Sequence, residues 1–234
     1  MGEAAFWGLV GASSLVLGAL VAFWFRIPDR ILGLVMAFGA GVLISAVAYE
    51  LVEAALAVSA TGVSVALGFA GGALVFFVGD TLIDRHLAGT AGWGILLGTV
   101  LDGVPESVVI GISLLSGDGV SVAVLVAVFL SNIPEAISAT ADLREGGVAR
   151  GQILLLWVAV VAASAVAAGL GYGLLGEASG ETIAAIDAFA AGAILTMLAD
   201  EMIPEGYERS GHRKLVGVVT AFGFGVAALL SFAT

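Results

Sequence analysis

The stretches "LDGVPESVVIGISL" (101–114) and "LSNIPEAISATADL" (130–143) each place a Pro-Glu pair inside a long apolar run. Proline removes a backbone hydrogen bond and glutamate carries a charge, so each residue alone is costly in an apolar helix. The two stretches align at Leu101/Leu130, Pro105/Pro134, Glu106/Glu135 and Leu114/Leu143. The recurrence of two costly residues at matching positions indicates that they serve a purpose in the fold.

The composition around these stretches is that of a membrane protein. The chain has 234 residues, of which 60% are hydrophobic and 12% are charged, and its mean hydropathy is +1.14. Soluble domains carry roughly 25% charged residues, so this chain lacks the charge that a water-exposed surface needs. Apolar runs of about 20 residues recur along its whole length, and each is long enough to cross a bilayer core of ~30 Å. We therefore predict an all-α polytopic membrane protein, with residues 1–234 forming a single transmembrane domain.

Clusters of Gly, Ser, Asp and Arg divide the chain into eight apolar runs. The predicted spans are 5–26, 31–57, 62–83, 90–115, 120–142, 150–175, 182–206 and 214–233. All basic residues fall in or next to the loops that follow the first, third, fifth and seventh spans: Arg26, Arg30, Arg85, Arg144, Arg150, Arg209, Arg213 and Lys214. Because Lys and Arg mark the cytoplasmic side, we expect a multi-pass protein of the cell membrane with both termini outside. Residues 1–5 lack the basic segment of a signal peptide, so we expect the first span to be retained.

Several classes of function do not fit this composition. The chain has no cysteine, which excludes disulfides, thiolate metal ligands and iron–sulfur clusters, and its net charge of −11 argues against nucleic acid as a partner. No span contains the histidine that a rhomboid-type protease needs, and "FVGD" (77–80) lacks the first glycine of the aspartyl intramembrane protease motif. A retinal protein needs a lysine within a span, but the one lysine of the chain, Lys214, only begins a span. We therefore expect no enzyme and no cofactor.

A second pair of segments suggests an internal repeat. "FGAGVLISAVAYELVEA" begins at Phe38 and "FAAGAILTMLADEMIPE" begins at Phe189. Aligned without gaps, they match at Phe38/Phe189, Ala40/Ala191, Gly41/Gly192, Ser45/Thr196, Ala48/Ala199 and Glu50/Glu201. The two segments belong to spans that cross the membrane in opposite directions, and inverted repeats with interrupted central helices are typical of secondary transporters. We predict that spans one to three and six to eight form an inverted repeat around a central antiparallel pair, spans four and five. Chance similarity between Ala- and Gly-rich helices is the alternative.

The Pro-Glu pairs suggest a cation site. Inside a helix, Pro105 frees the carbonyl of Leu101 and Pro134 frees that of Leu130, and such groups are tolerated in a bilayer only when something satisfies them. A cation would satisfy the carbonyls and the neighbouring carboxylates together. The spacing of these residues places oxygen ligands on facing sides of the two central spans. The predicted metal ligands are Asp102, Glu106, Ser131, Asn132 and Glu135. Oxygen ligands suit Mg, Ca, Mn or Fe(II) and are acceptable to Zn.

Further acids extend this site towards both ends of the bundle. The predicted outer pathway consists of Glu50, Glu53 and Asp187, and the predicted inner pathway consists of Asp200, Glu201 and Glu205. Two other interpretations remain open. Acids near helix ends reach interfacial water, and acids within the membrane also occur in protonated, hydrogen-bonded form or in proton relays.

Together these features resemble the ZIP (Zrt/Irt-like) family of divalent metal transporters, particularly its prokaryotic branch. "SNIPEAISATADLREG" (131–146) is similar to the family's fifth-helix segment with the core N-x-P-E-G, and "DGVPES" (102–107) occupies the place of H-N-x-P-E-G in the fourth helix. The segment 189–205 looks like the family's seventh helix, which often ends in E-E-x-x-P-E. The resemblance covers nearly the whole chain.

The resemblance also implies roles for individual residues. Glu106, Asn132 and Glu135 match metal ligands of the family, while Asp102, Gly103 and Ser131 stand in the places of a His, an Asn and a His or Gln. The 150–175 span lacks the acid that in many members completes a second metal site, and the only histidines, His86 and His212, fall in predicted cytoplasmic loops. The resemblance therefore implies an atypical, histidine-poor version of the family's metal site.

These inferences lead to one expected function and two alternatives. We expect transport of a divalent metal ion into the cytoplasm, with zinc as the family's usual substrate and with iron, manganese or another hard divalent ion left open. The resemblance implies an elevator-like or rocking motion, and homodimers are common in the family, so a second copy of the chain joins the metal ion and the lipid bilayer as an expected partner. The alternatives are a metal-binding membrane homologue that does not transport, acting as a sensor or structural protein, and a proton-coupled carrier of another solute.

Overall fold

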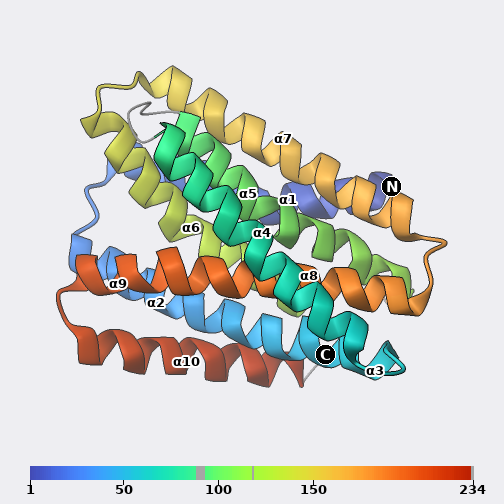
Figure 1. The fold of residues 1–234 in the computed structure, drawn as a ribbon. Helices are drawn as coiled ribbons and strands as arrows, with labels where there is room; N and C mark the ends of the chain where they lie inside the picture. Colours follow the sequence, from blue (N-terminus) through green and yellow to red (C-terminus); the bar gives the residue numbers. More distant parts are fainter. Residues whose placement is uncertain (88–92, 118, 233–234) are drawn as a thin grey trace.

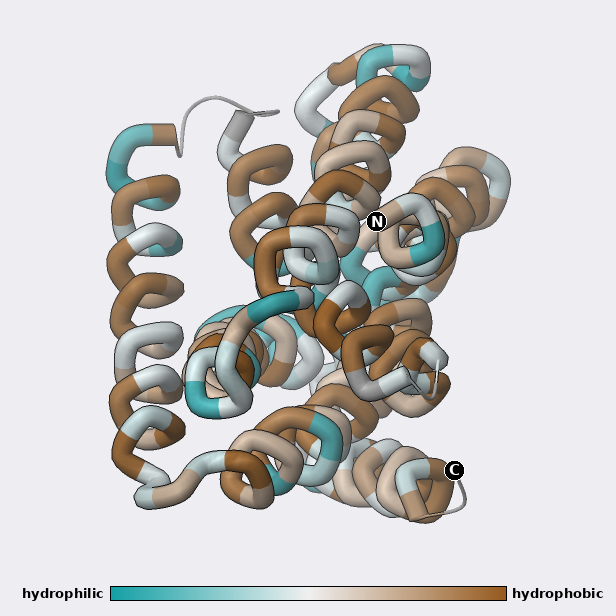
Figure 2. The backbone as a smooth tube through the Cα atoms, turned by 90° about the vertical axis from the view of Figure 1, so that its right-hand side faces the viewer, coloured by the Kyte–Doolittle hydropathy of each residue, from teal (hydrophilic) through white to brown (hydrophobic). Residues whose placement is uncertain are grey.

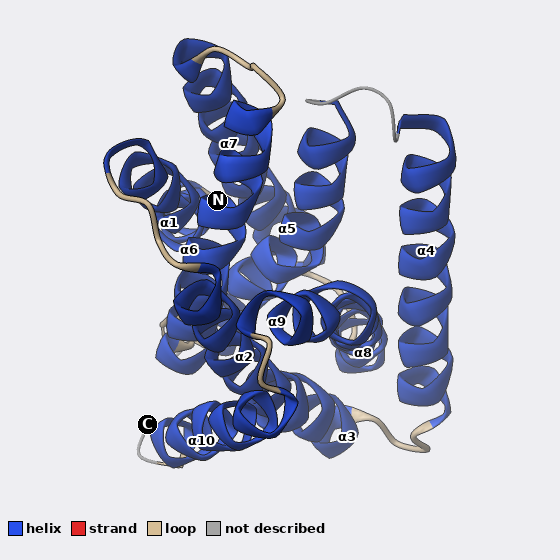
Figure 3. Ribbon diagram, turned by 90° about the vertical axis from the view of Figure 1, so that its left-hand side faces the viewer, coloured by secondary structure: helices blue, strands red, loops and turns tan. Residues whose placement is uncertain are grey.

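The computed structural model describes residues 1–87, 93–117 and 119–232, and this part of the chain contains helices and no strands (Figure 3). Within it, eight helical spans are long and apolar enough to cross a membrane. The predicted all-α class and the predicted number of spans are therefore confirmed. Figure 2 shows apolar residues along most of each helix and hydrophilic residues mainly towards the helix ends.

The bounds of the spans are close to those expected. The first four are α1 (Gly2–Trp24), α2 (Asp29–Ala46) continued by η1 (Val47–Glu53) and α3 (Ala54–Val58), α4 (Val63–Leu87), and α5 (Trp93–Ser113) followed by η2 (Leu114–Ser116). The last four are α6 (Val122–Glu145), α7 (Arg150–Leu175), α8 (Gly180–Met197) continued by η3 (Leu198–Met202) and α9 (Ile203–Ser210), and α10 (Arg213–Ser231). The predicted bounds at 90 and 233 lie outside the described residues.

Local chemistry explains where several helices begin and end. The side chain of Ser121 accepts a hydrogen bond from the backbone N–H of Val124 at the start of α6, and Ser179 accepts one from Thr182 at the start of α8. Serine is a preferred N-cap because its hydroxyl satisfies a backbone donor that has no partner within the helix. At the end of α9, Gly211 has a φ of +65°, the left-handed conformation that glycine adopts without strain.

Two spans contain π-helical segments that the sequence did not predict. α5 and α6 continue through Pro105 and Pro134, whereas the spans formed by α2–α3 and α8–α9 change to π-helix at η1 and η3. Pro204 lies at the start of α9, directly after η3. The sequence offset that aligns Phe38 with Phe189 also aligns the first residues of η1 and η3. π-Helical segments are rare and frequently occur at functional sites, and here they contain several of the predicted pathway acids.

The helices pack in two groups of four spans (Figure 1). One group consists of α1, α5, α6 and α7, and the other consists of α2–α3, α4, α8–α9 and α10. The groups meet where α2 packs against α6 and α8 packs against α5. Less than a fifth of the most apolar window of α4 and of α10 is buried (17% each), so these two helices expose most of their apolar surface to the surroundings, as expected for contact with lipid.

Two glycines allow close contacts within the second group. A Cβ on Gly41 of α2 would lie 2.0 Å from the carbonyl oxygen of Thr220 in α10, and a Cβ on Gly192 of α8 would lie 2.0 Å from the carbonyl oxygen of Phe69 in α4. Small residues let helices in a bilayer approach closely, which strengthens packing where no hydrophobic effect drives association. The offset that relates Gly41 to Gly192 also relates Phe69 to Thr220, so the two contacts are equivalent.

The two ends of the bundle differ in charge. The start of α1 and the end of α10 lie at one end, and the connections α1–α2, α6–α7 and α9–α10 lie at the other (Figure 1). The basic residues of the chain belong to this second end, called the basic end below, because all of them occur in these connections, in the adjoining helix turns or in the last turn of α4.

Candidate cation site

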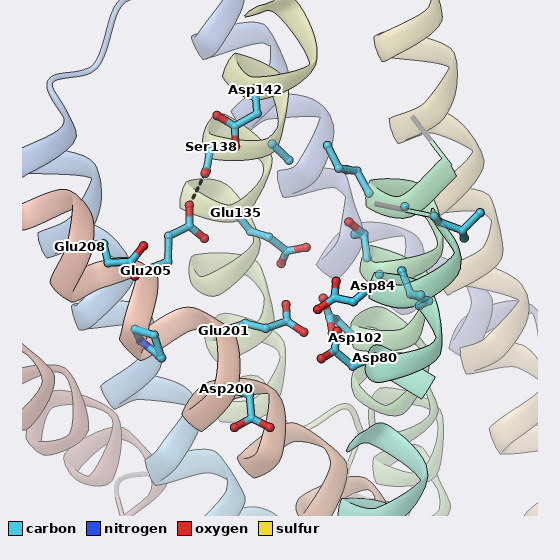
Figure 4. Close-up of a pocket in the computed structure, with 18 residues that line it drawn as sticks. Asp80, Asp84, Asp102, Glu135, Ser138, Asp142, Asp200, Glu201, Glu205 and Glu208 are labelled. Carbon is cyan, nitrogen blue, oxygen red and sulfur yellow. Dashed lines mark hydrogen bonds between the residues drawn. The ribbon is translucent and has the colours of Figure 1, made fainter. Parts of the chain in front are cut away.

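A cavity of about 670 Å³ extends from the basic end to the middle of the bundle (Figure 4). Called the inner cavity below, it lies where α5 and α6 of one group face α4, η3 and α9 of the other. Nine of its lining residues are acids: Asp80, Asp84, Asp102, Glu135, Asp142, Asp200, Glu201, Glu205 and Glu208. The described residues that line the inner cavity include no lysine, arginine or histidine. This concentration of carboxyl groups favours a cation.

Asp102 is a buried acid of the inner cavity with an oxygen atom that lacks a hydrogen-bond partner among the described residues. Its side chain is 7% exposed, and its Oδ1 atom has no hydrogen-bond partner among the described residues. A buried charged group is normally paired or bound to a metal, because it loses its hydration without compensation otherwise. Since Asp102 also lines the inner cavity, a cation bound there would supply the missing partner.

Three other carboxyl groups of the cavity, those of Asp80, Glu135 and Glu201, lie close enough to Asp102 to interact with its charge. In Figure 4 the carboxyl groups of Asp80 and Glu201 point towards Asp102 from α4 and η3. Those of Asp80 and Glu201 are close enough to share a hydrogen bond. The Glu135 carboxyl group reaches Thr99 of α5, and its charge interacts with that of Asp102. Both groups of helices therefore contribute carboxyl oxygen atoms to the inner cavity.

Glu106 occupies a different place from Asp102, although the two residues are one helical turn apart. It is 2% exposed and lines a very small pocket of about 10 Å³, which at most approaches the space that a single water needs. The remaining residues lining this pocket are apolar: Leu43, Ala46, Val47, Leu51, Val109, Val124, Ala127, Val128 and Ile194. These nine residues are called the apolar plug below. The charge of Glu106 still lies close enough to Glu135 for the two to repel each other.

A second cavity, of about 630 Å³, lies at the end of the bundle that holds the termini. It is called the outer cavity below, and the predicted pathway residues Glu50 and Asp187 both line it. Glu50 accepts a hydrogen bond of 2.8 Å from the Ser121 hydroxyl. Glu53 is exposed and does not line this cavity. On α5 and α6, the apolar plug lies between the residues of the inner cavity and the outer cavity, which two plug residues, Val109 and Val124, also line.

Arg209 compensates the negative charge at the mouth of the inner cavity. Its Nε donates to Glu205 Oε1 at 2.5 Å, and a terminal nitrogen donates to the Ser138 hydroxyl at 2.6 Å. Longer contacts of 3.3 and 3.4 Å join the guanidinium to Asp142 and Asp29. Ser138 also donates to Glu205. The predicted inner-pathway acid Glu205 is thus already engaged in an ion pair with Arg209, which follows it by four residues on α9, a spacing that could have indicated the pair.

Besides Glu106, two further predicted ligands lie away from the inner cavity. The Ser131 hydroxyl donates to the carbonyl of Val128 at 3.0 Å, and the Cα of Ser131 lies 3.3 Å from where a Cβ on Gly39 would be, so this residue faces α2. Asn132 is buried, and neither residue lines the cavity. Among the described residues, no three His, Cys, Asp or Glu side chains are close enough together to hold a metal ion directly.

The sequence analysis did not select several residues of the cavity. Asp80 and Asp84 stand four residues apart near the basic end of α4, a spacing that places both on one helix face and could have identified them. Asp142 was not considered, and Arg209 was considered only as a basic residue that marks the cytoplasmic side. The contacts of Arg209 with Asp142 and Ser138 join helices far apart in the sequence, which no local pattern encodes.

No family model matches the chain, and no curated protein matches it significantly. The resemblance to ZIP transporters therefore stays a prediction from the motifs.

Proposed function

We propose that the protein carries a divalent metal cation across the membrane into the cytoplasm. The observation that carries this proposal is Asp102, a buried acid with an unpartnered oxygen atom. It lines the inner cavity near the middle of the bundle, among many other carboxyl groups. Intramembrane acids of this kind usually belong to ion pathways. The motif resemblance to ZIP transporters leads to the same class of substrate.

The two cavities support a carrier mechanism. A carrier exposes its site to one side of the membrane at a time, and here the inner cavity reaches from the basic end to the acids while the apolar plug closes the path to the outer cavity. From the positive-inside rule we infer that the basic end is cytoplasmic and that both termini lie outside the cell membrane. This arrangement corresponds to a carrier that is open to the cytoplasm.

The equivalent glycine contacts support an inverted repeat. The counterpart of Gly41 in α2 is Gly192 in α8, and the counterpart of Thr220 in α10 is Phe69 in α4. The contact of Gly41 with Thr220 is therefore repeated as the contact of Gly192 with Phe69. The π-helical segments η1 and η3 obey the same relation. Such repeats give a carrier two similar arrangements, one open to each side, and this is the architecture expected from the sequence.

The oxygen ligands indicate which ions the proposed carrier would accept. Carboxylates and hydroxyls suit hard cations such as Mn²⁺ and Mg²⁺, while the family resemblance suggests Zn²⁺, and Fe²⁺ falls between these groups. A panel of these ions in one flux assay would identify the substrate.

The test is metal uptake into liposomes that contain the purified protein. We expect Glu106→Gln combined with Glu135→Gln to abolish flux, because both carboxylates near the middle of the bundle are lost, and we expect the protein to remain folded by size-exclusion chromatography. The matched control is Glu3→Gln combined with Glu177→Gln, which removes two exposed acids at the end of the bundle opposite the basic end. Unchanged flux in the Glu106/Glu135 variant rejects the site, and metal binding without flux in the unmodified protein favours the non-transporting alternative.

A further inference from the structure

We propose that a third cavity, at the basic end, binds the headgroup of an anionic phospholipid. The cavity has a volume of about 640 Å³ and is called the headgroup cavity below. It is lined by residues from the end of α1, the α1–α2 connection, the start of α2, the end of α6 and α9, and Figure 1 shows these segments at the same end of the bundle. The proposal concerns lipid binding alone and holds whether or not the protein carries a cation.

The headgroup cavity lies largely on a different face of α6 from the inner cavity. Glu135 and Ala139 line the inner cavity, whereas Ile137, Ala141 and Arg144 line the headgroup cavity. Because α1 and α6 belong to the first group of helices while α2 and α9 belong to the second, a lipid headgroup in this cavity would contact both groups.

Two arginines of the headgroup cavity have N–H groups available for a ligand. Arg144 is half-buried, and one of its terminal nitrogens donates to the carbonyl oxygen of Ala22 at 2.6 Å, which holds the guanidinium in place. Arg26 is exposed and has no hydrogen-bond or ion-pair partner among the described residues. A guanidinium group carries several N–H donors in a fork that matches phosphate oxygen atoms. The pair therefore favours a phosphate group as ligand.

The acids of the headgroup cavity do not cancel this charge. Asp29 and Asp142 lie 3.4 and 3.3 Å from the guanidinium of Arg209, so the third arginine of the cavity already pairs with them. The remaining acid among the described lining residues is Glu145, which is exposed to water. The local charge is therefore positive, although the chain as a whole carries −11.

The apolar part of the lining favours a lipid over a soluble phosphate. The apolar lining residues are Ala22, Phe25, Ile27, Leu32, Ile137 and Ala141. Phe25 and the preceding Trp24 are 64% and 72% exposed, and aromatic residues at helix ends are typical of the headgroup level of a membrane. Basic pockets between membrane helices on the cytoplasmic side are known to bind anionic headgroups. The volume of the cavity also falls in the range of about 300–1,000 Å³ that is typical of ligand pockets.

Binding of phosphatidylglycerol to the delipidated full-length protein, measured by native mass spectrometry, tests this proposal. We expect Arg26→Gln combined with Arg144→Gln to raise the dissociation constant of the tightest-bound lipid by about tenfold or more, because two charged donor groups are lost. The matched control is Arg30→Gln combined with Arg85→Gln, which removes two exposed arginines of the basic end that do not line the cavity. Since both double variants have the same net charge, the control should change this constant by less than about twofold.

The comparison of ligands identifies the headgroup. Phosphatidylcholine with the same acyl chains should bind at least about tenfold more weakly than phosphatidylglycerol, because it has no net charge. Equal affinity for the two lipids overturns the anionic headgroup. Displacement of phosphatidylglycerol by an equal concentration of glycerol phosphate would assign the arginines to a soluble phosphate and overturn the lipid site.

The comparison of variants locates the site. Equal losses of affinity in the two double variants would show a general attraction between anionic lipid and the basic end, which overturns the headgroup cavity as the site. If the Arg26/Arg144 variant does not fold, Arg26→Gln alone takes its place, because its side chain loses no partner among the described residues. Unchanged phosphatidylglycerol affinity in whichever of these variants is folded overturns the proposal.

Discussion

At the scale of single residues, Asp102 and Arg209 represent two ways of holding a charge in this bundle. Asp102 is buried and has an unsatisfied oxygen atom, while Arg209 is surrounded by acceptors from α2, α6 and α9. Sequence reasoning identified Asp102, because it stands one helical turn before the Glu of a Pro-Glu pair. It did not identify the partners of Arg209, because Asp29, Ser138 and Asp142 are distant in the sequence.

Arg209→Gln is expected to lower the free energy of unfolding by about 1–2 kcal/mol, because hydrogen bonds to the Glu205 carboxylate and to the buried Ser138 hydroxyl are lost. Asp29→Asn should change it by less than about 0.5 kcal/mol, since the Asp29 side chain is 74% exposed and the contact is long. Thermal unfolding followed by tryptophan fluorescence measures both. Equal effects of the two substitutions would show that Arg209 does not depend on its buried partners.

At the scale of helices, the sequence predicted the spans well and their internal irregularities poorly. The eight spans follow from apolar length and from the position of basic residues, and both signals are strong in this chain. Pro105 and Pro134 were expected to interrupt their helices, but α5 and α6 continue through them. The irregular segments are instead η1 and η3, and η1 contains no proline that would have indicated it. Packing between helices can favour a π-helical turn, and such packing leaves no local mark in the sequence.

The glycine contacts between helices provide a test at this scale. Gly41→Ala and Gly192→Ala should each lower the free energy of unfolding by about 1–3 kcal/mol, because each added methyl group meets a backbone carbonyl oxygen that cannot move alone. The matched control is Gly217→Ala in α10, where nothing lies within 4 Å of the added Cβ. That variant should be neutral or more stable by up to about 1 kcal/mol, since alanine favours helix. If Gly41→Ala melts like Gly217→Ala, the close contact between α2 and α10 does not exist.

At the scale of the whole molecule, the side to which the cavity opens could not be predicted from the sequence. The motifs placed acids at the middle of the chain's central spans, and the basic residues predicted which end of the bundle is cytoplasmic. The apolar plug, however, consists of residues such as Leu43, Val47 and Ile194, which resemble any other apolar residues of a membrane span. Only the packing of the two groups of helices gives them this position.

Single cysteines test both the orientation and the closure, because the natural chain contains none that would react. Ala139→Cys lies in the inner cavity, Ala54→Cys in the outer cavity, and Ala127→Cys in the apolar plug, where the native side chain is fully buried. In intact cells, a membrane-impermeant maleimide should label Ala54→Cys but not Ala139→Cys, since we propose that the basic end faces the cytoplasm. Permeabilised cells should add labelling of Ala139→Cys, while Ala127→Cys should stay protected under both conditions until the protein is denatured. Labelling of Ala139→Cys from outside intact cells would mean that the orientation is reversed or that the apolar plug does not close the path.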